Sequence, residues 1–399
     1  MSKVGIGLIG CGARLRGVVK RIPGMGEDIE VRALCDVSAD SIARAQKALA
    51  ADAKVNEDYR DLVKDPAIDW VLIGSWNCYH REHAIAALEA GKHVFCEKPL
   101  ATTFEDCVAI RDAWRASDRL FSVGFVLRYS PHYQRLREAV LSGKVGRIVS
   151  MEFNETLAPS HGAFIHMDWR RRTSWAGSHL LEKCCHDLDL AGWILGSVPL
   201  RAASFGGLDF FHSGNAAHEN LYPQDERGRS PFHLWPATSH ASVASPFHDD
   251  KDIIDNQVAI LEYANGVRAT FHTNCMSTVP ERRMYILGTH GTLRGDVING
   301  SLEFKPVSLE RGKPERLDSG VSGGHGGADG TLSGSLRESM VNGAPPLATP
   351  DEGLISAAVA FATDEAMTEG RVVDLTPMWQ RAGLDLSAFS RQSACARAG

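Results

Sequence analysis

The sequence predicts an α/β protein, with a doubly wound parallel sheet in its first part and an α+β domain with an open, mostly antiparallel sheet in its second part. Three observations support this fold class. Apolar runs alternate with helical patterns over the first third of the chain, glycines close the first apolar run, and period-two strands with hairpin turns follow from Arg147. We expect one domain over residues 1–125 and a second over residues 126–399, with a long insertion at 206–255.

The expected strands of the first domain are short apolar runs, typical of strands buried on both faces. They are KVGIGLIGCG (3–12), EVRALCD (30–36), DWVLIGS (69–75), KHVFCE (92–97) and RLFSVGF (119–125). Helical patterns lie between them, and one of these, at 38–50, has Ser38 or Asp40 available as its N-cap. Strands separated by helices of about 10–15 residues favour a parallel sheet.

The second domain carries strand patterns at 147–156, 255–275 and 282–306, with the turn signals ANG and THG between strands. The stretch 206–255 lacks periodicity, and it is expected either to cover the substrate or to form an oligomer arm. It carries five histidines without a repeated ligand spacing, so no metal is expected there: His212, His218, His233, His240 and His248.

Composition limits the classes of function. The 399 residues, 44% hydrophobic and 23% charged, are typical of a globular protein with two or three domains. A net charge of −6 gives no basic face for nucleic acid or an anionic membrane, and no apolar run approaches the ~20 residues of a membrane helix. Nine cysteines without a C-x-x-C pair favour neither a disulfide framework nor a zinc site. We therefore expect a reduced, cytoplasmic protein without a secretory signal.

A glycine loop closes the first strand. Gly10 allows a tight turn, and Gly12 lets backbone N–H groups approach a pyrophosphate at a helix N-terminus. Asp36 ends the next strand, where a carboxylate accepts hydrogen bonds from ribose hydroxyls and repels a 2′-phosphate, which predicts NAD rather than NADP. Asp36 as a helix N-cap is the alternative. Leu15 stands in the place of a third glycine. The expected loop contacts are Gly10, Gly12, Ala13, Arg14 and Leu15.

The stretch FCEKPLA (95–101) places two opposite charges at the end of a buried strand. A solvated turn would explain such charges. In a doubly wound sheet, however, ligands bind at the carboxyl ends of strands, so Lys98 projects towards the same crevice as the glycine loop. There it supplies a cationic donor beside the nicotinamide. The bond before Pro99 is a candidate for the cis form.

A second candidate patch lies in AGSHLLEKCCHDLDLAGWILG (176–196), whose apolar spacing predicts one helix. Glu182 and His186 are then i and i+4 and share a face. Histidine suits proton transfer near neutral pH, although a buried core histidine is the alternative. Asp187 and Asp189 do not converge with His186 on a helix, so no metal is expected.

Just before this stretch, HMDWRRRTSW (166–175) sets arginines beside aromatic residues. Trp169 and Arg170 are substrate-binding candidates, since a planar guanidinium can hold an anionic or richly hydroxylated sugar. For Arg171 and Arg172 a solvated loop is an equal alternative.

Three stretches together resemble the glucose-fructose oxidoreductase / inositol dehydrogenase / rhizopine-catabolism (Gfo/Idh/MocA) family. They are GLIGCGAR (7–14), GSWNCYHREHAIAALEAGKHVFCEKPLA (74–101) and VGFVLRYSPHYQRLREAVLSGKVGRI (123–148), and the similarity runs from residue 3 to about 375. The resemblance implies a Rossmann domain and an NAD-dependent oxidoreductase that acts on a secondary alcohol of a sugar, sugar derivative or cyclic polyol. It further implies a homo-oligomer, dimer or tetramer.

The resemblance also implies roles for single residues. Lys98 would hydrogen-bond the reacting hydroxyl, and His186 would accept its proton, with Glu182 in place of the family's usual Asp one turn earlier. Trp76 stands where most members have proline, and Ser178 where they have glycine. The further cofactor-lining positions are Ser75, Trp76, Asn77, His80, Glu97 and Arg128.

Two alternative functions stay open at this stage. One is an NAD-dependent glycosidase that oxidises a ring hydroxyl transiently, because SGGHGGADG (322–330) resembles a Gly-His-Gly-Gly segment of such enzymes. That resemblance makes His325 a substrate-site candidate, whereas a flexible linker is the plain interpretation. The other is a cofactor-sensing binding protein, which would not need both Lys98 and His186.

Overall fold

The computed structural model describes residues 3–235, 241–309, 312–321 and 324–390. The chain divides into two compact units, one made of residues 1–130 with 322–357 and the other of residues 131–321 with 358–399. The expected boundary near residue 125 stays a prediction, but the return of residues 322–357 to the first unit was not expected. In the part of the chain given above, no helix is both long and apolar enough to cross a membrane.

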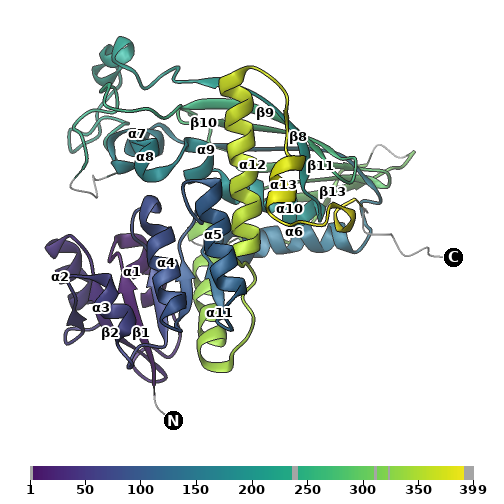
Figure 1. Cartoon of the computed structure of the whole chain (residues 1–399). Helices are drawn as coiled ribbons and strands as arrows, with labels where there is room; N and C mark the ends of the chain where they lie inside the picture. Colours follow the sequence, from purple (N-terminus) through teal and green to yellow (C-terminus); the bar gives the residue numbers. More distant parts are fainter. Residues whose placement is uncertain (1–2, 236–240, 310–311, 322–323, 391–399) are drawn as a thin grey trace. The chain divides into compact units, whose positions relative to one another are not determined.

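The first unit contains a six-stranded parallel sheet of order β3-β2-β1-β4-β5-β6, which confirms the doubly wound class. Figure 1 labels β1 and β2 of this sheet together with the helices α1 to α4 of the same unit. The order reverses between β1 and β4, and in such sheets ligands bind at the carboxyl ends beside this point. The glycine loop after β1 and the residues after β4 and β5 therefore share one edge. The strands are β1 (Val4–Ile9), β2 (Ile29–Cys35), β3 (Lys54–Val55), β4 (Trp70–Ile73), β5 (His93–Cys96) and β6 (Phe121–Val123).

The helices α2, α3 and α5 of this unit begin at polar caps. Ser38 is the N-cap of α2, and its hydroxyl accepts a hydrogen bond from Ser41 N at 3.2 Å. Asp58 and Thr103 cap α3 and α5 in the same way. The helical segments are α1 (Ala13–Lys20), α2 (Ala39–Ala48), α3 (Tyr59–Lys64), η1 (Asn77–Tyr79), α4 (His80–Glu89), α5 (Phe104–Arg115), η2 (Val126–Tyr129), η5 (Gly324–Gly327) and α11 (Ala328–Asn342).

The second unit contains a nine-stranded sheet of order β14-β13-β12-β11-β7-β10-β9-β8-β15. All neighbours are antiparallel except β7 and β10, as expected for a mostly antiparallel sheet. Along β9 the burial alternates, so one face packs on the core and the other is open. The strands are β7 (Ile148–Thr156), β8 (Pro199–Gly207), β9 (Asn256–Tyr263), β10 (Arg268–Asn274), β11 (Arg283–Gly288), β12 (Gly291–Asp296), β13 (Ser301–Pro306), β14 (Glu315–Arg316) and β15 (Val373–Asp374).

The single helix predicted over 176–196 is wrong, because the chain forms two helices with a break at Lys183 and Cys184. At Cys184 the ψ angle is 1°, which interrupts the helical path. The apolar spacing is the same for one helix and for two in succession, so periodicity does not reveal the break. The helical segments of this unit are α6 (Pro131–Leu141), α7 (Pro159–Met167), η3 (Trp169–Arg171), α8 (Thr173–Ala176), α9 (His179–Glu182), α10 (Cys185–Leu195), η4 (Ser213–Asn220), α13 (Thr376–Arg381) and η6 (Leu386–Ala388), while α12 (Pro350–Glu369) contributes to both units.

The insertion after β8 folds back onto α7 of its own unit. Three of its phenylalanines, Phe211, Phe232 and Phe247, are at most 2% exposed and pack with Ile165 and other apolar residues of α7. Asp255 fixes the start of the insertion, because its carboxylate accepts hydrogen bonds from three consecutive backbone N–H groups, at 209–211, at 2.7–2.9 Å. Residues 236–240, which include His240, lie outside the described part of the insertion.

Candidate active site

The glycine loop after β1 leaves room for a dinucleotide phosphate. Gly10 has φ +82°, and a Cβ there would lie 2.3 Å from Ser75 N, so only glycine fits. At Gly12 there is open space, since a Cβ there would meet no atom within 4 Å. Gly12 precedes Ala13, the first residue of α1, without a side-chain cap. Open space in front of an uncapped helix N-terminus fits a pyrophosphate group.

The glycine loop lacks the third glycine of the dinucleotide-binding motif, and Gly74 after β4 provides the close contact between helix and strand instead. Leu15 is 1% exposed and packs against Gly74, the residue after β4, where a Cβ would lie 2.8 Å from the Leu15 Cβ. The close approach of helix and strand is therefore kept by a glycine on the strand instead of on the helix.

Asp36 stands at the end of β2 and holds the glycine loop. Its Oδ2 accepts a hydrogen bond from Cys11 N at 2.6 Å, and its Oδ1 accepts one from Ser38 N at 2.8 Å. It is not the N-cap of α2, because Ser38 takes that place. A carboxylate oxygen has two lone pairs, so both oxygens keep capacity for ribose hydroxyls. The ribose role stays a prediction.

The residues after β4 are fixed by two buried histidines. His83 Nδ1 lies 2.9 Å from Ser75 Oγ, and His80 lies between two carbonyls, Pro99 O at 2.8 Å and Ser75 O at 3.2 Å. Burial lowers the pKa of His80, although its two backbone partners oppose this shift, and burial lowers the pKa of His83 to about 3, so the His83 ring is neutral. A neutral imidazole carries a single N–H, so in that form His80 donates to one of its two carbonyl neighbours and acts through the backbone that it holds. His83 was not predicted, since nothing in its spacing marks it.

Trp76 keeps the backbone that the family's proline would require. Its φ and ψ are −65° and 148°, and φ near −65° is the angle that a proline ring imposes. Asn77 follows as the first residue of η1 and is 4% exposed. The departure from the family sequence at Trp76 therefore leaves the local path unchanged.

A chain of charges joins the glycine loop to the Glu-Lys-Pro motif. Arg14 Nε lies 2.9 Å from Glu97 Oε1, and Arg14 Nη1 lies 2.6 Å from Asp329 Oδ1. Asp329 in turn accepts a hydrogen bond from His325 Nδ1 at 3.1 Å. Although burial opposes it, the hydrogen bonds from His325 and Arg14 hold the pKa of Asp329 well below its usual range. Asp329 was missed by sequence reasoning, because its partner is distant in the chain.

Lys98 follows β5 and is half-buried, and its bond to Pro99 is cis, as anticipated. His325 is exposed and adopts φ 49° in the turn before α11, while Ser322 and Gly323 of the same segment lie outside the described residues. Arg128 is buried in η2, and its guanidinium donates to Leu347 O at 3.0 Å. Contacts of these three side chains with a cofactor or substrate stay predictions.

In the second unit, Glu182 ends α9 and His186 is the second residue of α10, and both are buried. Arg170 pairs with two carboxylates, Glu182 at 2.9 Å and Asp168 at 3.1 Å, and its guanidinium lies 4.5 Å from the Trp169 ring centre. The charge of Arg170 is therefore already balanced. This pairing favours hydroxyl groups over an anion as its further partners.

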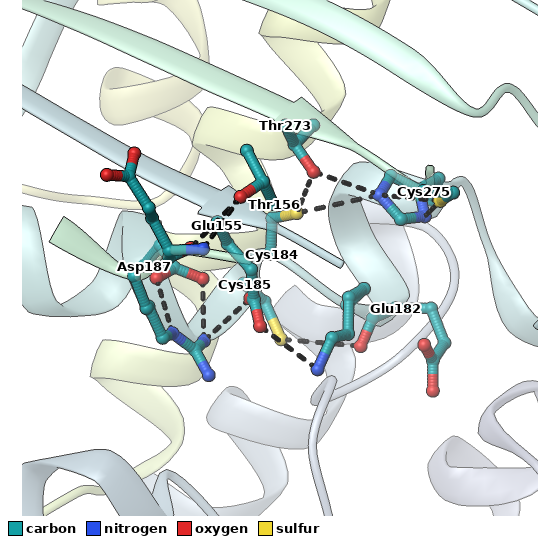
Figure 2. A network of polar contacts seen from close by, with 12 residues as sticks. Glu155, Thr156, Glu182, Cys184, Cys185, Asp187, Thr273 and Cys275 are labelled. Carbon is teal, nitrogen blue, oxygen red and sulfur yellow. Dashed lines mark hydrogen bonds and ion pairs between the residues drawn. The ribbon is translucent and has the colours of Figure 1, made fainter. Parts of the chain in front are cut away.

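In the same unit, a buried ion network fixes the start of α10 (Figure 2). Arg282 binds Asp187 through two bonds of 2.8 and 2.7 Å and also lies 2.8 Å from Glu155, which pairs with Lys183 at 3.1 Å. Although burial opposes it, Arg282 and Lys183 hold the pKa of Glu155 well below its usual range. Glu155, Cys184 and Asp187 converge within 4.8 Å, but Arg282 and Lys183 already contact the two carboxyl groups, so these ion pairs account for the cluster.

Arg171 and Arg172 hold the insertion. Arg171 donates to the carbonyls of Asp250 and Ala241 at 2.8 and 2.6 Å and pairs with the Asp250 carboxylate at 2.7 Å. Arg172 pairs with the same carboxylate. The solvated-loop interpretation is wrong for Arg171, which is 4% exposed, and contact of either arginine with a substrate stays a prediction.

Comparison with known proteins agrees with this architecture. A family model described as "Oxidoreductase family, NAD-binding Rossmann fold" matches residues 4–125, and one described as "Oxidoreductase family, C-terminal alpha/beta domain" matches residues 137–375. YteT of Bacillus subtilis (strain 168) is 24% identical over 387 residues, 86% of this chain and 88% of YteT. The inositol 2-dehydrogenase of Gluconacetobacter diazotrophicus is 34% identical over 196 residues, which span 48% of this chain and 54% of that enzyme.

Among solved structures, levoglucosan dehydrogenase in complex with NADH and levoglucosan has the same fold, with a TM-score of 0.76 at 20% identity over 94% of this chain and 100% of the other. The two family models together cover most of the sequence. The resemblance drawn from the sequence motifs is thereby confirmed. This chain belongs to the Gfo/Idh/MocA family of oxidoreductases, and its first unit carries the family's NAD-binding Rossmann domain.

Proposed function

We propose that this protein uses NAD to oxidise, or in reverse to reduce, a secondary alcohol of a sugar, sugar derivative or cyclic polyol. The observation that carries the proposal is the Glu97-Lys98-Pro99 motif at the carboxyl end of β5, in the same sheet edge as the open glycine loop. Relatives named inositol 2-dehydrogenase support the substrate class, although the alignments span about half of those enzymes.

The cofactor contacts follow from the first unit. Backbone N–H groups at Gly12 and Ala13 would hold the pyrophosphate, and Asp36 would hold the adenosine ribose. Residues after β4 and β5 would line the nicotinamide end. When bound, NAD supplies the hydride acceptor or donor. The expected lining residues are Arg14, Ser75, Trp76, Asn77, Glu97, Lys98 and Arg128, and the buried Leu15 and His80 would support the backbone of this lining.

Two side chains would handle the substrate hydroxyl. Lys98 would donate a hydrogen bond to the oxygen as negative charge develops there, and His186 would accept the hydroxyl proton. Glu182 is ion-paired with Arg170, so we assign it a positioning role instead of proton transfer. Trp169 and Arg170 would contact the remaining hydroxyl groups of the ring, since the charge of Arg170 is balanced by two carboxylates.

We also propose that the protein is a cytoplasmic homo-oligomer that pairs through the open face of the second sheet. Phe205, Val258 and Ile260 on that face are 72%, 45% and 58% exposed and border a hollow of about 310 Å³. Contiguous apolar exposure of this kind marks interaction surfaces. Light scattering coupled to gel filtration should give a dimer or tetramer, and Ile260→Glu should yield monomers. A monomeric wild-type protein would refute this assembly.

The proposed activity is tested by incubating the purified protein with NAD+ and a panel of sugars, inositols and aryl glycosides while following NADH absorbance. We expect NADH to accumulate with one class of ring alcohols and to be lost in Lys98→Met and His186→Asn. Release of the aglycone without net NADH would instead identify a redox-cycling glycosidase, and His325→Ala should then abolish that release.

A further inference from the structure

An exposed aromatic residue of the insertion, Trp235, pairs with a ring of α7. Trp235 stacks on His161 of α7, with ring centres 4.2 Å apart and an angle of 23° between the planes. Phe164, one turn later on α7, lies 5.5 Å from the same indole. Trp235 is nevertheless 43% exposed. A large part of the indole surface therefore faces solvent, while the His161 ring packs against the indole.

This exposure sets Trp235 apart from the other large aromatic residues of the insertion. Phe211 and Phe232 are 0% exposed and Phe247 is 2% exposed, and together they form the core that holds the insertion on α7. That core is complete without Trp235. Exposing a large apolar ring costs free energy that burial against an apolar partner recovers, at roughly 25 cal/mol per Å².

The pair is continuous with the candidate site of the second unit. The Arg170 guanidinium lies 5.5 Å from the Phe164 ring centre and 4.5 Å from that of Trp169, and it pairs with Glu182 at 2.9 Å. His161 also lies within electrostatic range of Glu182 and Arg170. We call Trp169, Phe164, Trp235 and His161 the aromatic strip. It leads from the Arg170–Glu182 pair to the exposed indole.

The His161 end of the strip is uncharged. Burial lowers the pKa of His161 to about 2, and the positive charge of Lys183 acts in the same direction. A neutral imidazole stacked on an indole supports it with an uncharged ring face. The charged group next to the strip is Arg170, whose guanidinium lies over the Phe164 and Trp169 rings.

We propose that the exposed end of the aromatic strip, Trp235 supported by His161, binds a second ring attached to the ring that the enzyme oxidises. The substrate would then be a disaccharide or a glycoside rather than a free monosaccharide. The C–H face of a sugar ring, like the face of an aryl group, is flat and apolar, so both can pack on an indole. This inference rests on the proposed dehydrogenase activity and deepens it by naming the substrate class.

The test compares one reacting ring in three forms: glucose, cellobiose and phenyl β-glucoside, with galactose, lactose and phenyl β-galactoside as a second set. In the wild type we expect kcat/KM to be at least tenfold higher for the extended forms. Trp235→Ala should remove that preference by raising KM for the extended substrates, and it should leave kcat/KM for the monosaccharide within twofold of the wild-type value. Stacking of a ring on an aromatic side chain stabilises binding by about enough to account for a tenfold preference. The comparison of disaccharide with phenyl glycoside tells which kind of ring the platform prefers.

Leu234→Ala is the matched control, because Leu234 is the neighbouring residue and is 41% exposed. It should leave all ratios unchanged. Trp235→Phe should retain part of the preference for extended substrates. Equal kinetics of the wild type and Trp235→Ala on all substrates would overturn the proposal, and so would an equal loss on short and long ones.

Binding measured without turnover separates this inference from the proposed activity. Titration calorimetry with cellobiose and phenyl β-glucoside should show binding that Trp235→Ala weakens about tenfold. If no substrate yields NADH while this Trp235-dependent binding persists, the platform stands and the proposed activity fails. If NADH forms but Trp235→Ala binds the glycosides as the wild type does, the platform is refuted and the activity stands.

Discussion

Arg14 of the glycine loop is ion-paired with Asp329, with Arg14 Nη1 2.6 Å from Asp329 Oδ1, although 315 positions separate the two residues in the chain. The same arginine lies 2.9 Å from Glu97, the neighbour of Lys98. The first turn of α11 thus steadies both the loop that would hold the pyrophosphate and the motif that would face the nicotinamide. The helix α11, which is remote from Arg14 in the sequence, therefore contributes Asp329 to the expected cofactor site.

The first prediction follows from this pair. Asp329→Asn removes the charge that balances Arg14 and loosens its orientation, so we expect NADH affinity to fall about tenfold, the size of one charge-assisted hydrogen bond. Quenching of protein fluorescence by NADH measures the Kd. Glu338→Gln, an exposed carboxylate on the same helix, is the control and should leave the Kd unchanged. An unchanged Kd in Asp329→Asn would show that the ion pair does not steady the cofactor loop.

The second prediction concerns the choice between NAD and NADP. Asp36→Ser removes the carboxylate at the end of β2, so its repulsion of a 2′-phosphate disappears. We expect the ratio of NADPH to NADH affinity to rise at least tenfold, even though losing the bond to Cys11 N weakens both cofactors. Parallel titrations with the two nucleotides give this ratio, and Asp40→Asn on α2 is the control. A ratio that stays at the wild-type value would mean that Asp36 only holds the glycine loop.

The third prediction addresses the buried ion network. Arg282→Met leaves Asp187 and Glu155 without their shared cation, and an uncompensated buried charge costs about 3–5 kcal/mol of unfolding free energy. Urea unfolding at pH 7 measures the loss. The neighbouring Arg283, which is 40% exposed and pairs with Glu152, gives the matched control Arg283→Met, expected to cost below about 1 kcal/mol. Equal losses in the two variants would contradict the structural role of the network.

The fourth prediction concerns acid stability. His166 is 0% exposed and stacks on Phe211, and burial holds its pKa well below the usual value. Below pH 6.5 the unfolded chain binds a proton that the folded protein does not, so the unfolding free energy falls as the pH falls. His166→Phe removes one such group. Between pH 7.5 and 5 the variant should therefore lose about 2 kcal/mol less than the wild type.

Urea unfolding at pH 7.5, 6 and 5 measures this slope, with exposed His290→Phe as the control. The remaining buried histidines keep a residual slope in the variant, because burial lowers the pKa of His132 and of His179 to about 4. A variant that loses as much stability as the wild type would show that His166 is protonated in the folded protein.

Local patterns predict much of this fold. The five apolar runs of the first domain became β1, β2, β4, β5 and β6, because a strand buried on both faces is apolar throughout. The turn at Gly10 and the edge that carries Lys98 follow from the same pattern. The two-residue strand β3 was missed, since Lys54 and Val55 are both exposed and carry no burial signal.

Contacts between residues that are distant in the chain could not be predicted from the sequence. The partners of Arg14, Asp187 and Ser75 lie on other elements, so no spacing rule links them to Asp329, Arg282 or His83. The contact of Leu15 with Gly74, which replaces the third loop glycine, also joins two separate elements and could not be predicted from spacing. The broken helix before His186 was missed for another reason, because apolar periodicity continues across the break at Cys184.

The most direct measurement of the central claim is hydride transfer itself, in a single turnover with a ring alcohol that carries deuterium on the reacting carbon. We expect the wild type to move this deuterium to the nicotinamide, which mass spectrometry of the reduced cofactor detects. Lys98→Met and His186→Asn should still bind NADH at saturating concentration and transfer deuterium at least about 100-fold more slowly. Deuterium transfer at the wild-type rate in both variants, or none in the wild type with any alcohol of the panel, would contradict the account.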